Sequence, residues 1–258
     1  MKQEIHPTAE HGFGQDASMY EYARPNYPSA ITSWLTEDMG LNSSTTAIDL
    51  AAGTGKFTHY LAETQSKIIA VEPVKAMAEQ FEQQHPNIPL ISAFSHDIPL
   101  ENQSVDAIVS AQAFHWFAHI DTLQEVHRLL KPEGHFGLIW NYRDTSHPWV
   151  QAISEVIASF EDNTPRFHHQ KWQYAFEHQN LFLKKSEKEF SYTHTGTVDK
   201  VVCQRLRSTS FIAALPLNEQ ERIQKTLESI VYDYLNKTPT DIIDFPYCTY
   251  AYDFIRLE

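Results

Sequence analysis

The chain has 258 residues, of which 33 are acidic and 20 are basic, so its formal net charge is −13. A hydrophobic fraction of 42% is enough to build a buried core, which excludes a disordered or fibrous protein. Each phosphate contact needs a Lys or Arg, so this charge argues against a protein that holds nucleic acid or an anionic membrane mainly through phosphates.

The first residues are polar and contain no apolar stretch of the signal-peptide type, and the longest largely apolar run, 107–120, is too short to span a bilayer. Cys203 and Cys248 are the only cysteines, which gives neither a CxxC metal site nor a disulfide framework. We therefore expect a soluble, cytoplasmic protein with no metal, no nucleic-acid partner and no membrane partner. The oligomeric state stays open.

Short apolar runs alternate with helix-like stretches between residues 46 and 141. The runs cover 46–50, 67–71, 90–93, 105–109 and 136–140. Such runs suit strands that are covered on both faces, as in a parallel sheet between helices. Helices are predicted over 74–84 and 119–130. Alternating strand and helix predicts an α/β fold with right-handed crossovers.

The pattern changes after Trp140. A helix is predicted near 148–161 and another over 218–235, the second with Asn218 and Glu221 placed as a capping box. Strands are predicted over 187–194 and 247–255. The second half is therefore expected to close the sheet and to insert helices above one edge of it.

A glycine turn follows the first predicted strand. Gly53 and Gly55 let the backbone turn tightly and let a ligand approach, and Asp49 stands just before them. The second strand ends in Glu72, 17 residues beyond Gly55, where a carboxylate can accept hydrogen bonds from both hydroxyls of a ribose. The residues therefore indicate a cofactor of the adenosine type.

The details of the turn favour a cationic cofactor. The third glycine of a dinucleotide fingerprint is replaced by Thr58, and the carboxylate of Asp49 suits a cation better than two phosphates. S-adenosylmethionine carries a sulfonium and an ammonium group and no phosphate, so the chemistry favours it over NAD.

Several motifs resemble those of class I S-adenosylmethionine-dependent methyltransferases. They are the glycine motif 49–55, with Ala51-Ala52 where Gly-Cys is usual, the acidic motif 71–73, the stretch 98–106 and the run 128–134. The segments 13–28, 112–117 and 245–247 are similar to the small-molecule branch that includes trans-aconitate methyltransferases and the methyltransferase type 11 family. The resemblance covers nearly the whole chain.

This resemblance implies a Rossmann-like, seven-stranded, mostly parallel sheet with helices on both faces and inserted helical lid segments. It implies a single methyltransferase domain over 1–258. Within it, 41–141 would form the cofactor-binding half, 142–240 the lid and acceptor-binding segments with the sixth strand, and 245–258 the closing strand.

The resemblance also implies a cofactor site. Glu72 would bind the ribose, while the adenine region departs from the family pattern because Phe94 and His96 occupy usually acidic positions. Tyr20 and Arg24 would cap the cofactor. The full set of expected cofactor-binding residues is Tyr20, Arg24, Asp49, Ala51, Gly53, Gly55, Glu72, Phe94, Ser95 and Gln112.

The expected reaction is an in-line displacement that leaves S-adenosylhomocysteine, so the enzyme must align the reactants and exclude water. A carboxylate acceptor needs no base, whereas a hydroxyl, an amine or an acidic carbon does. His115 is the candidate base, with a packed, hydrogen-bonded histidine as the alternative. Trp116 is expected to wall the acceptor site, and Arg143, Arg205 and Arg207 are candidate partners of an acceptor carboxylate.

Other functions stay open at this point. The altered adenine segment and Ala51-Ala52 leave open the alternative that the protein is a non-catalytic regulatory protein that binds S-adenosylmethionine. An RNA methyltransferase is disfavoured by the net charge of −13 and by the lack of an added basic module.

Overall fold

The computed structural model describes residues 23–162 and 164–258, so the predicted cap residue Tyr20 lies outside the described residues. The chain forms two compact units. The sheet unit consists of Tyr27–Trp140, Pro165–Phe190 and Thr249–Glu258. The helical unit consists of the described part of Met1–Asn26 together with Asn141–Thr164 and Ser191–Cys248.

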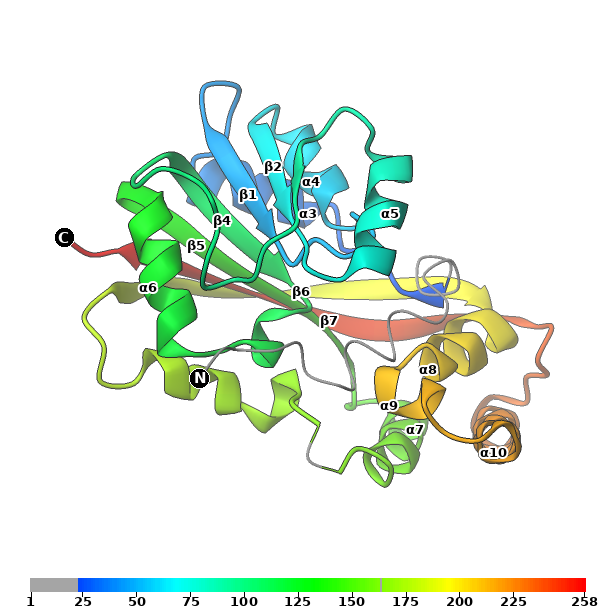
Figure 1. Cartoon of the computed structure of the whole chain (residues 1–258). Coiled ribbons are helices and arrows are strands. Elements are labelled where there is room, and N and C mark those ends of the chain that lie inside the picture. Colours follow the sequence, from blue (N-terminus) through cyan, green and yellow to red (C-terminus); the bar gives the residue numbers. More distant parts are fainter. Residues whose placement is uncertain (1–22, 163) are drawn as a thin grey trace. The chain divides into compact units, whose positions relative to one another are not determined.

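A seven-stranded sheet has the order β3-β2-β1-β4-β5-β7-β6. Its strands are β1 (Thr46–Leu50), β2 (Lys67–Val71), β3 (Leu90–Ile91), β4 (Val105–Ala111), β5 (Leu130–Arg143), β6 (Phe182–Thr197) and β7 (Ile242–Arg256). All the pairings among β3, β2, β1, β4 and β5 are parallel. The predicted Rossmann-like, mostly parallel α/β sheet is confirmed (Figure 1).

The helices of the sheet unit follow the predicted alternation. They are α3 (Ala30–Ser33), the π-helical turn η1 (Trp34–Asp38), α4 (Thr58–Glu63), α5 (Lys75–Gln84), α6 (Ile120–Leu129) and the 3-10 turns η2 (Phe114–Trp116), η3 (Phe167–His169) and η4 (Lys171–Phe176). In α6 the side chains of Leu123, Val126 and Leu129 are buried at helical spacing. The helix ends there because Leu130 is already extended and begins β5.

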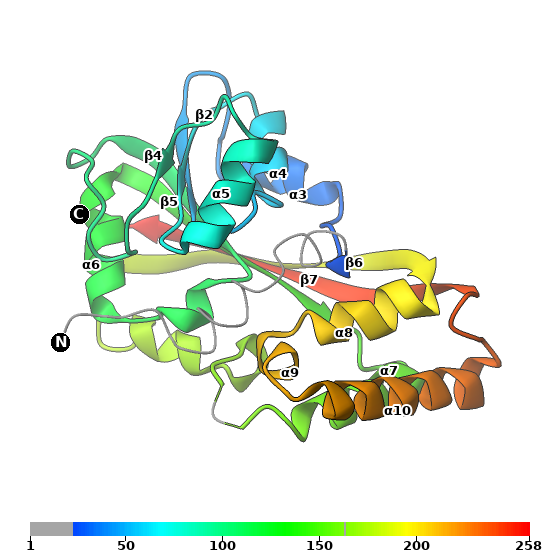
Figure 2. The ribbon, with the colours of Figure 1, turned by 45° about the vertical axis from the view of Figure 1, so that its right-hand side comes forward.

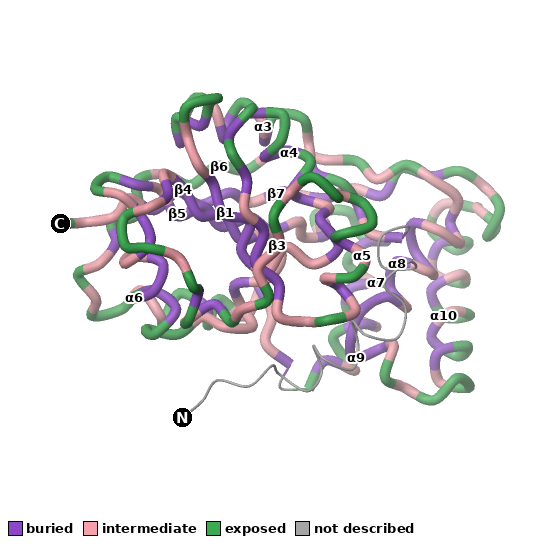
Figure 3. Tube along the Cα trace, turned by 45° about the horizontal axis from the view of Figure 1, so that its top comes forward, coloured by how far each residue is buried: buried purple, intermediate pink, exposed green. Residues whose placement is uncertain are grey.

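The core of the sheet unit lies on both sides of its central strands. Figure 3 shows buried backbone along β1, β4 and β5, as expected for strands covered on both faces. Trp34 and Leu35 pack in one cluster with Leu61 of α4 and Ile139 of β5. This packing fixes β1 and the turn that follows it, which is where the candidate site begins.

The helical unit has a core of its own. Its helices are α7 (Pro148–Ala158), the π-helical η5 (Asp199–Gln204), α8 (Arg205–Arg207), α9 (Ser210–Ala213) and α10 (Leu217–Leu235) (Figure 2). Ile223, Leu227 and Val231, spaced four apart on α10, are buried in this core.

The predicted capping box at the start of α10 is wrong. The helix begins at Leu217, before Asn218, and its N-cap is Pro216, with no side-chain cap hydrogen bond. The fixed φ of proline, here −55°, starts the helix earlier than the capping box predicts, with the N-cap at Pro216 instead of Asn218.

None of the helices in the described chain combines the length and the apolar character that crossing a lipid bilayer requires. Neither cysteine forms a disulfide; Cys203 is buried and Cys248 is half-buried. Burial raises the pKa of the Cys203 thiol to about 12, so this thiol is chemically inert near neutral pH.

Candidate cofactor site

The glycine turn lies at the carboxyl edge of the sheet. The Ala52 N–H donates to the Val71 carbonyl at 3.1 Å, which ties the turn after β1 to the end of β2. The turn has three residues with positive φ: Ala51 (58°), Gly53 (60°) and Gly55 (90°). Ligands of open α/β sheets bind at this edge.

The two glycines face different surroundings. A Cβ placed on Gly53 would meet no atom of the described residues within 4 Å, so this part of the chain leaves space on this side of the turn. A Cβ on Gly55 would collide with the ring of His85 and would lie 3.0 Å from Phe81. His85 Nε2 also lies 3.0 Å from the Gly55 carbonyl oxygen, so α5 supports the turn from behind.

Glu72 lies beside the open glycine. Its Oε2 accepts a hydrogen bond from the Gly53 N–H at 2.9 Å, and its Oε1 accepts one from the Val74 N–H at 2.8 Å. Burial raises the pKa of Glu72 to about 6, although both hydrogen bonds lower it. The two backbone donors fix the carboxylate next to the turn.

Asp49 lies beneath the turn. Its side chain is 1% exposed, and its Oδ2 accepts a hydrogen bond from the Thr58 hydroxyl at 2.6 Å. Burial raises the pKa of Asp49 to about 7, and the nearby Glu72 raises it further while Thr58 lowers it. Sequence reasoning used Thr58 only as a missing glycine; its hydroxyl in fact connects the start of α4 to β1.

The predicted adenine segment forms a turn, in which the Asp97 N–H donates to the Phe94 carbonyl at 3.1 Å. The Phe94 ring is 41% exposed and stacks on His96 with 5.7 Å between ring centroids. The Ser95 side chain is buried, and its hydroxyl lies 2.8 Å from that of Thr122. The segment therefore presents an aromatic face and a backbone turn instead of the acidic side chain usual in the family.

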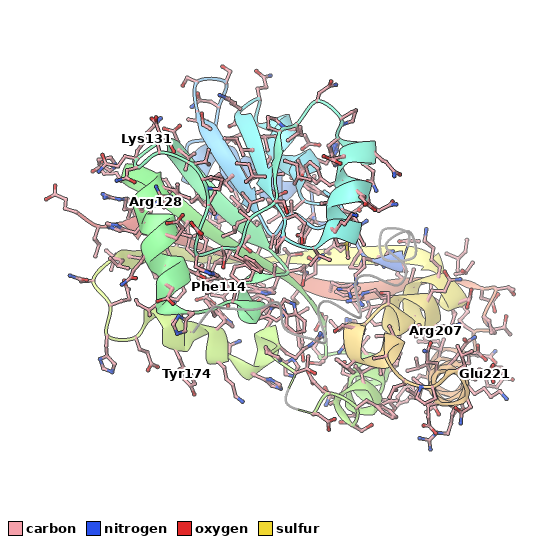
Figure 4. The ribbon with its side chains drawn as sticks, viewed as in Figure 1. Phe114, Arg128, Lys131, Tyr174, Arg207 and Glu221 are labelled. Carbon is pink, nitrogen blue, oxygen red and sulfur yellow. The ribbon has the colours of Figure 1, made fainter. Side chains whose placement is uncertain are left out.

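Arg128 holds the loop that follows this segment. Its Nη2 donates to the Ile98 carbonyl at 2.9 Å and its Nη1 to the Leu100 carbonyl at 2.7 Å. Glu125 pairs with Arg128 at 2.7 Å, and its Oε1 also accepts from the Ile98 N–H. Figure 4 shows Arg128 projecting from α6 toward this loop. The motif resemblance gave Arg128 no role; the acid–arginine spacing of three on one helix face was its only sequence signal.

Three further predicted residues follow β4. The Gln112 N–H donates to the Ile139 carbonyl at 2.8 Å, which keeps this segment at the carboxyl edge of the sheet. The rings of His115 and Trp116 are tilted, with centroids 5.1 Å apart. The Trp140 indole N–H donates to His115 Nδ1 at 3.1 Å, so a neutral His115 carries its proton on Nε2.

The predicted arginines belong to the helical unit. Arg24 Nη2 donates to the Ser208 carbonyl at 2.8 Å. Arg143 is buried, and its Nε donates to the Ser154 hydroxyl at 3.0 Å. Arg207, labelled in Figure 4, lies on α8 with Nη1 3.4 Å from the amide oxygen of Gln224 on α10.

The fold is that of a Rossmann-like α/β protein, and comparison with known proteins gives its class. Residues 48–138 match the family described as "Methyltransferase domain". The chain is 35% identical over 241 residues to the uncharacterized methyltransferase-like C25B8.10 of Schizosaccharomyces pombe, covering 93% of both proteins. It is 34% identical over 245 residues to the uncharacterized methyltransferase C25B8.09 of the same yeast, covering 93% of this chain and 95% of the other.

Solved structures show the same fold. A candidate type II methyltransferase from Anaeromyxobacter dehalogenans superposes with a TM-score of 0.62 at 22% identity, covering 90% of this chain and 96% of the other. The chain therefore belongs to the methyltransferase family, and it is an S-adenosylmethionine-dependent enzyme. The turn fits this cofactor, since it combines open space at Gly53 with the buried acids Asp49 and Glu72.

Proposed function

We propose that the enzyme methylates a small organic acceptor that carries a carboxylate, and that the turn after β1 and Glu72 hold the cofactor. The hydrogen bond between Glu72 and Gly53 carries the cofactor part of this proposal. It holds a carboxylate beside a turn whose outer side is open, and a ribose offers two hydroxyl donors to a carboxylate so placed.

When bound, S-adenosylmethionine supplies a methyl group on a cationic sulfur, and a lone pair of the acceptor forms the new bond to carbon as the carbon–sulfur pair stays on sulfur. In our proposal, Ala51, Gly53 and Gly55 line the methionine end with backbone, and Gln112 lies near the same end. Phe94 offers its exposed face to adenine, and Ser95 offers its backbone N–H.

Asp49 acts on the cofactor from beneath the turn. Its buried carboxylate is bound to the Thr58 hydroxyl, so its contribution is the orientation of the turn and a negative potential beneath it. A cation bound above the turn favours the ionised forms of Asp49 and Glu72, whose pKa values burial raises. The two acids therefore favour a positively charged cofactor over a dinucleotide.

His115 is proposed as a positioning donor more than as a base. Its Nδ1 accepts the Trp140 indole N–H, so the proton of the neutral ring lies on Nε2 and the lone pair of Nδ1 is already engaged. A carboxylate acceptor suits this arrangement, because it loses no proton on methylation and accepts a hydrogen bond well. Trp116, which packs on His115, is proposed to wall the acceptor.

A matched pair of glycine variants tests the cofactor site. Gly53 and Gly40 both have positive φ, at 60° and 70°, and at neither would an added Cβ meet an atom of residues 23–162 or 164–258 within 4 Å. Gly53→Ala and Gly40→Ala should therefore lose similar stability. Only Gly53→Ala should weaken the binding of S-adenosylhomocysteine, by tenfold or more in calorimetry, because only there does the Cβ enter ligand space. Equal affinities in the two variants would contradict the proposed site.

Glu72→Gln tests the ribose contact and keeps a side-chain acceptor for the Gly53 N–H. We expect the dissociation constant of S-adenosylhomocysteine to rise about tenfold, in line with the loss of a charged hydrogen-bond acceptor. Methyl release measured across a panel of small carboxylic acids, and across matched uncharged amides, tests the acceptor class. Turnover of the amides but not the acids would refute a carboxylate acceptor.

A cytoplasmic location stays a prediction from the sequence.

A further inference from the structure

One face of α6 holds the loop that contains the predicted adenine segment. Thr122, Glu125 and Arg128 are spaced three apart, so they lie on the same side of this helix. Each of them contacts residues 95–102 through a polar group. The neighbouring side chains of Leu123 and Val126 are buried and anchor the helix in the sheet unit. A polar face on an anchored helix can therefore hold this loop in one position.

Arg128 holds the far end of the loop. Its Nη2 donates to the Ile98 carbonyl at 2.9 Å, and its Nη1 donates to the Leu100 carbonyl at 2.7 Å. The same Nη1 donates to the side-chain oxygen of Asn102 at 2.7 Å. A guanidinium presents its donors in a rigid fork, so this one side chain fixes three acceptors of the loop at once.

Glu125 fixes Arg128 and the same end of the loop. Its two carboxylate oxygens accept from Nε and Nη2 of Arg128, both at 2.7 Å. Its Oε1 also accepts from the Ile98 N–H at 2.7 Å. Burial raises the pKa of Glu125, but these hydrogen bonds outweigh burial and bring the pKa below its ordinary value. Glu125 is therefore ionised at neutral pH, and its bidentate pair with Arg128 is of the strong, charge-assisted kind.

Thr122 holds the near end of the loop. Its hydroxyl lies 2.8 Å from the hydroxyl of Ser95, and both side chains are buried. Ser95 lies inside a turn that is closed by the hydrogen bond from the Asp97 N–H to the Phe94 carbonyl. The turn is therefore held by α6 on both sides, at Ser95 and at Ile98.

This turn carries the two groups that we propose to meet adenine, the Phe94 ring and the Ser95 N–H. An exposed ring stacks on any flat base, so Phe94 alone would distinguish bases poorly. A backbone N–H is more selective, because it needs an acceptor at the right distance and angle. The selectivity for the base then depends on how firmly the turn is held.

We propose that Thr122, Glu125 and Arg128 are positioning residues that set the preference of the enzyme for an adenine-bearing cofactor. This inference rests on the proposed function and deepens it, because the three side chains act through the turn and do not touch the cofactor. The backbone that they hold takes over base recognition from the acidic side chain that is usual in the family.

A change of base in the ligand tests this role. S-inosylhomocysteine differs from S-adenosylhomocysteine only in its base. Hypoxanthine carries an N–H and a carbonyl at the edge where adenine carries a nitrogen lone pair and an amino group, so donor and acceptor are exchanged. A turn fitted to adenine should bind S-inosylhomocysteine at least about tenfold more weakly in calorimetry. The ratio of the two dissociation constants is the readout.

Substitutions in the pair should lower this ratio. Arg128→Met and Glu125→Gln should weaken the binding of S-adenosylhomocysteine and reduce the ratio about threefold or more. Arg128→Lys should behave like Arg128→Met, because an ammonium group keeps the charge and loses the fork. Arg222→Met is the matched control: Arg222 pairs with Glu219, three residues earlier on α10, at the same distance of 2.7 Å. This variant should keep both affinities.

Thermal unfolding separates positioning from stability. Arg128→Met should unfold at a lower temperature than the wild type, because it loses several hydrogen bonds. A purely structural role predicts this fall together with an unchanged ratio. Thr122→Val, which replaces one buried hydroxyl by a methyl group, should also lower the ratio, so it tests the inference even if the arginine variant fails to fold.

Three results would overturn the inference: equal binding of the two ligands by the wild type, an unchanged ratio in the Arg128 and Thr122 variants, or equal effects of Arg128→Met and Arg222→Met. Glu72→Gln keeps this test apart from that of the cofactor site. Both ligands contain the same ribose, so this variant should weaken both equally and leave the ratio unchanged. If Glu72→Gln weakens both ligands while Arg128→Met leaves the ratio unchanged, only the present inference fails; if Glu72→Gln weakens neither, the proposed cofactor site itself fails.

Discussion

Replacing Gly55 by alanine combines two independent costs that the structure separates. The backbone at Gly55 has φ +90°, a conformation that costs an L-residue about 1–2 kcal/mol. The added Cβ also collides with the His85 ring and lies 3.0 Å from Phe81, and overpacking of this kind costs about 1–3 kcal/mol. We therefore expect Gly55→Ala to lower the free energy of unfolding by about 2–5 kcal/mol.

Gly53→Ala is the control for the backbone cost alone. Its φ is +60° and its Cβ would meet no atom within 4 Å in the part of the chain that the structure describes, so we expect a loss of only about 1–2 kcal/mol. Urea unfolding of both variants measures the difference, which is the steric part of the Gly55 effect.

A double-mutant cycle identifies the group responsible for the collision. Adding His85→Ala to Gly55→Ala should recover about 1–3 kcal/mol, because the ring that the Cβ meets is gone. The reasoning is refuted if the two glycine variants lose equal stability, or if the His85 substitution recovers nothing.

Three further predictions concern the same unit. Burial raises the pKa of Asp49 to about 7 and that of Glu72 to about 6, so the folded enzyme holds these protons more tightly than the unfolded chain does. The ligand-free enzyme should therefore lose stability as the pH rises from about 4 to 7. Midpoints of urea unfolding measure this loss, which should be smaller in Asp49→Asn than in the wild type. Ala51→Gly should raise the free energy of unfolding by about 1 kcal/mol, since Ala51 has φ 58°; a decrease would contradict strain there. His115→Ala should lower kcat/KM about tenfold or more, while His115→Gln, which keeps an N–H donor, retains more activity. Equal loss in both would indicate a base.

The sequence predicted the regular elements well where their boundaries are local. The strands β1 and β2 occupy the predicted residues, α5 begins one residue later than predicted, and α6 is one residue shorter at each end. Each of these four elements is a run or a stripe of apolar residues, and the residues that flank it end the strand or the helix. By contrast, β6 extends from Phe182 to Thr197, beyond the predicted 187–194, because much of it is exposed and leaves a weak apolar pattern.

The candidate cofactor site was predictable only in part. A motif places Glu72 near Gly53, because both lie at the ends of neighbouring parallel strands. Other contacts were not predictable, because they join residues about 30 positions apart and no periodic pattern in the sequence indicates them. They are the contact of His85 with Gly55 and the hydrogen bonds of Arg128 to the loop. The tautomer of His115 also depends on a distant residue, because the indole of Trp140 on β5 donates to its Nδ1. The sequence alone therefore left the role of His115 open between a base and a packed residue.

The surroundings of Trp140 have a consequence for how the substrate preference of the enzyme can change. The Trp140 ring packs against the rings of Phe167, Trp172 and Tyr252, with 4.7–5.9 Å between its centroid and theirs. These rings come from late parts of the chain, yet they set the orientation of Trp140 and, through its N–H, the side of the imidazole that bears hydrogen. Under the role that we propose for His115, substitutions in this aromatic stack should change acceptor preference even though none of the stacked residues contacts the acceptor.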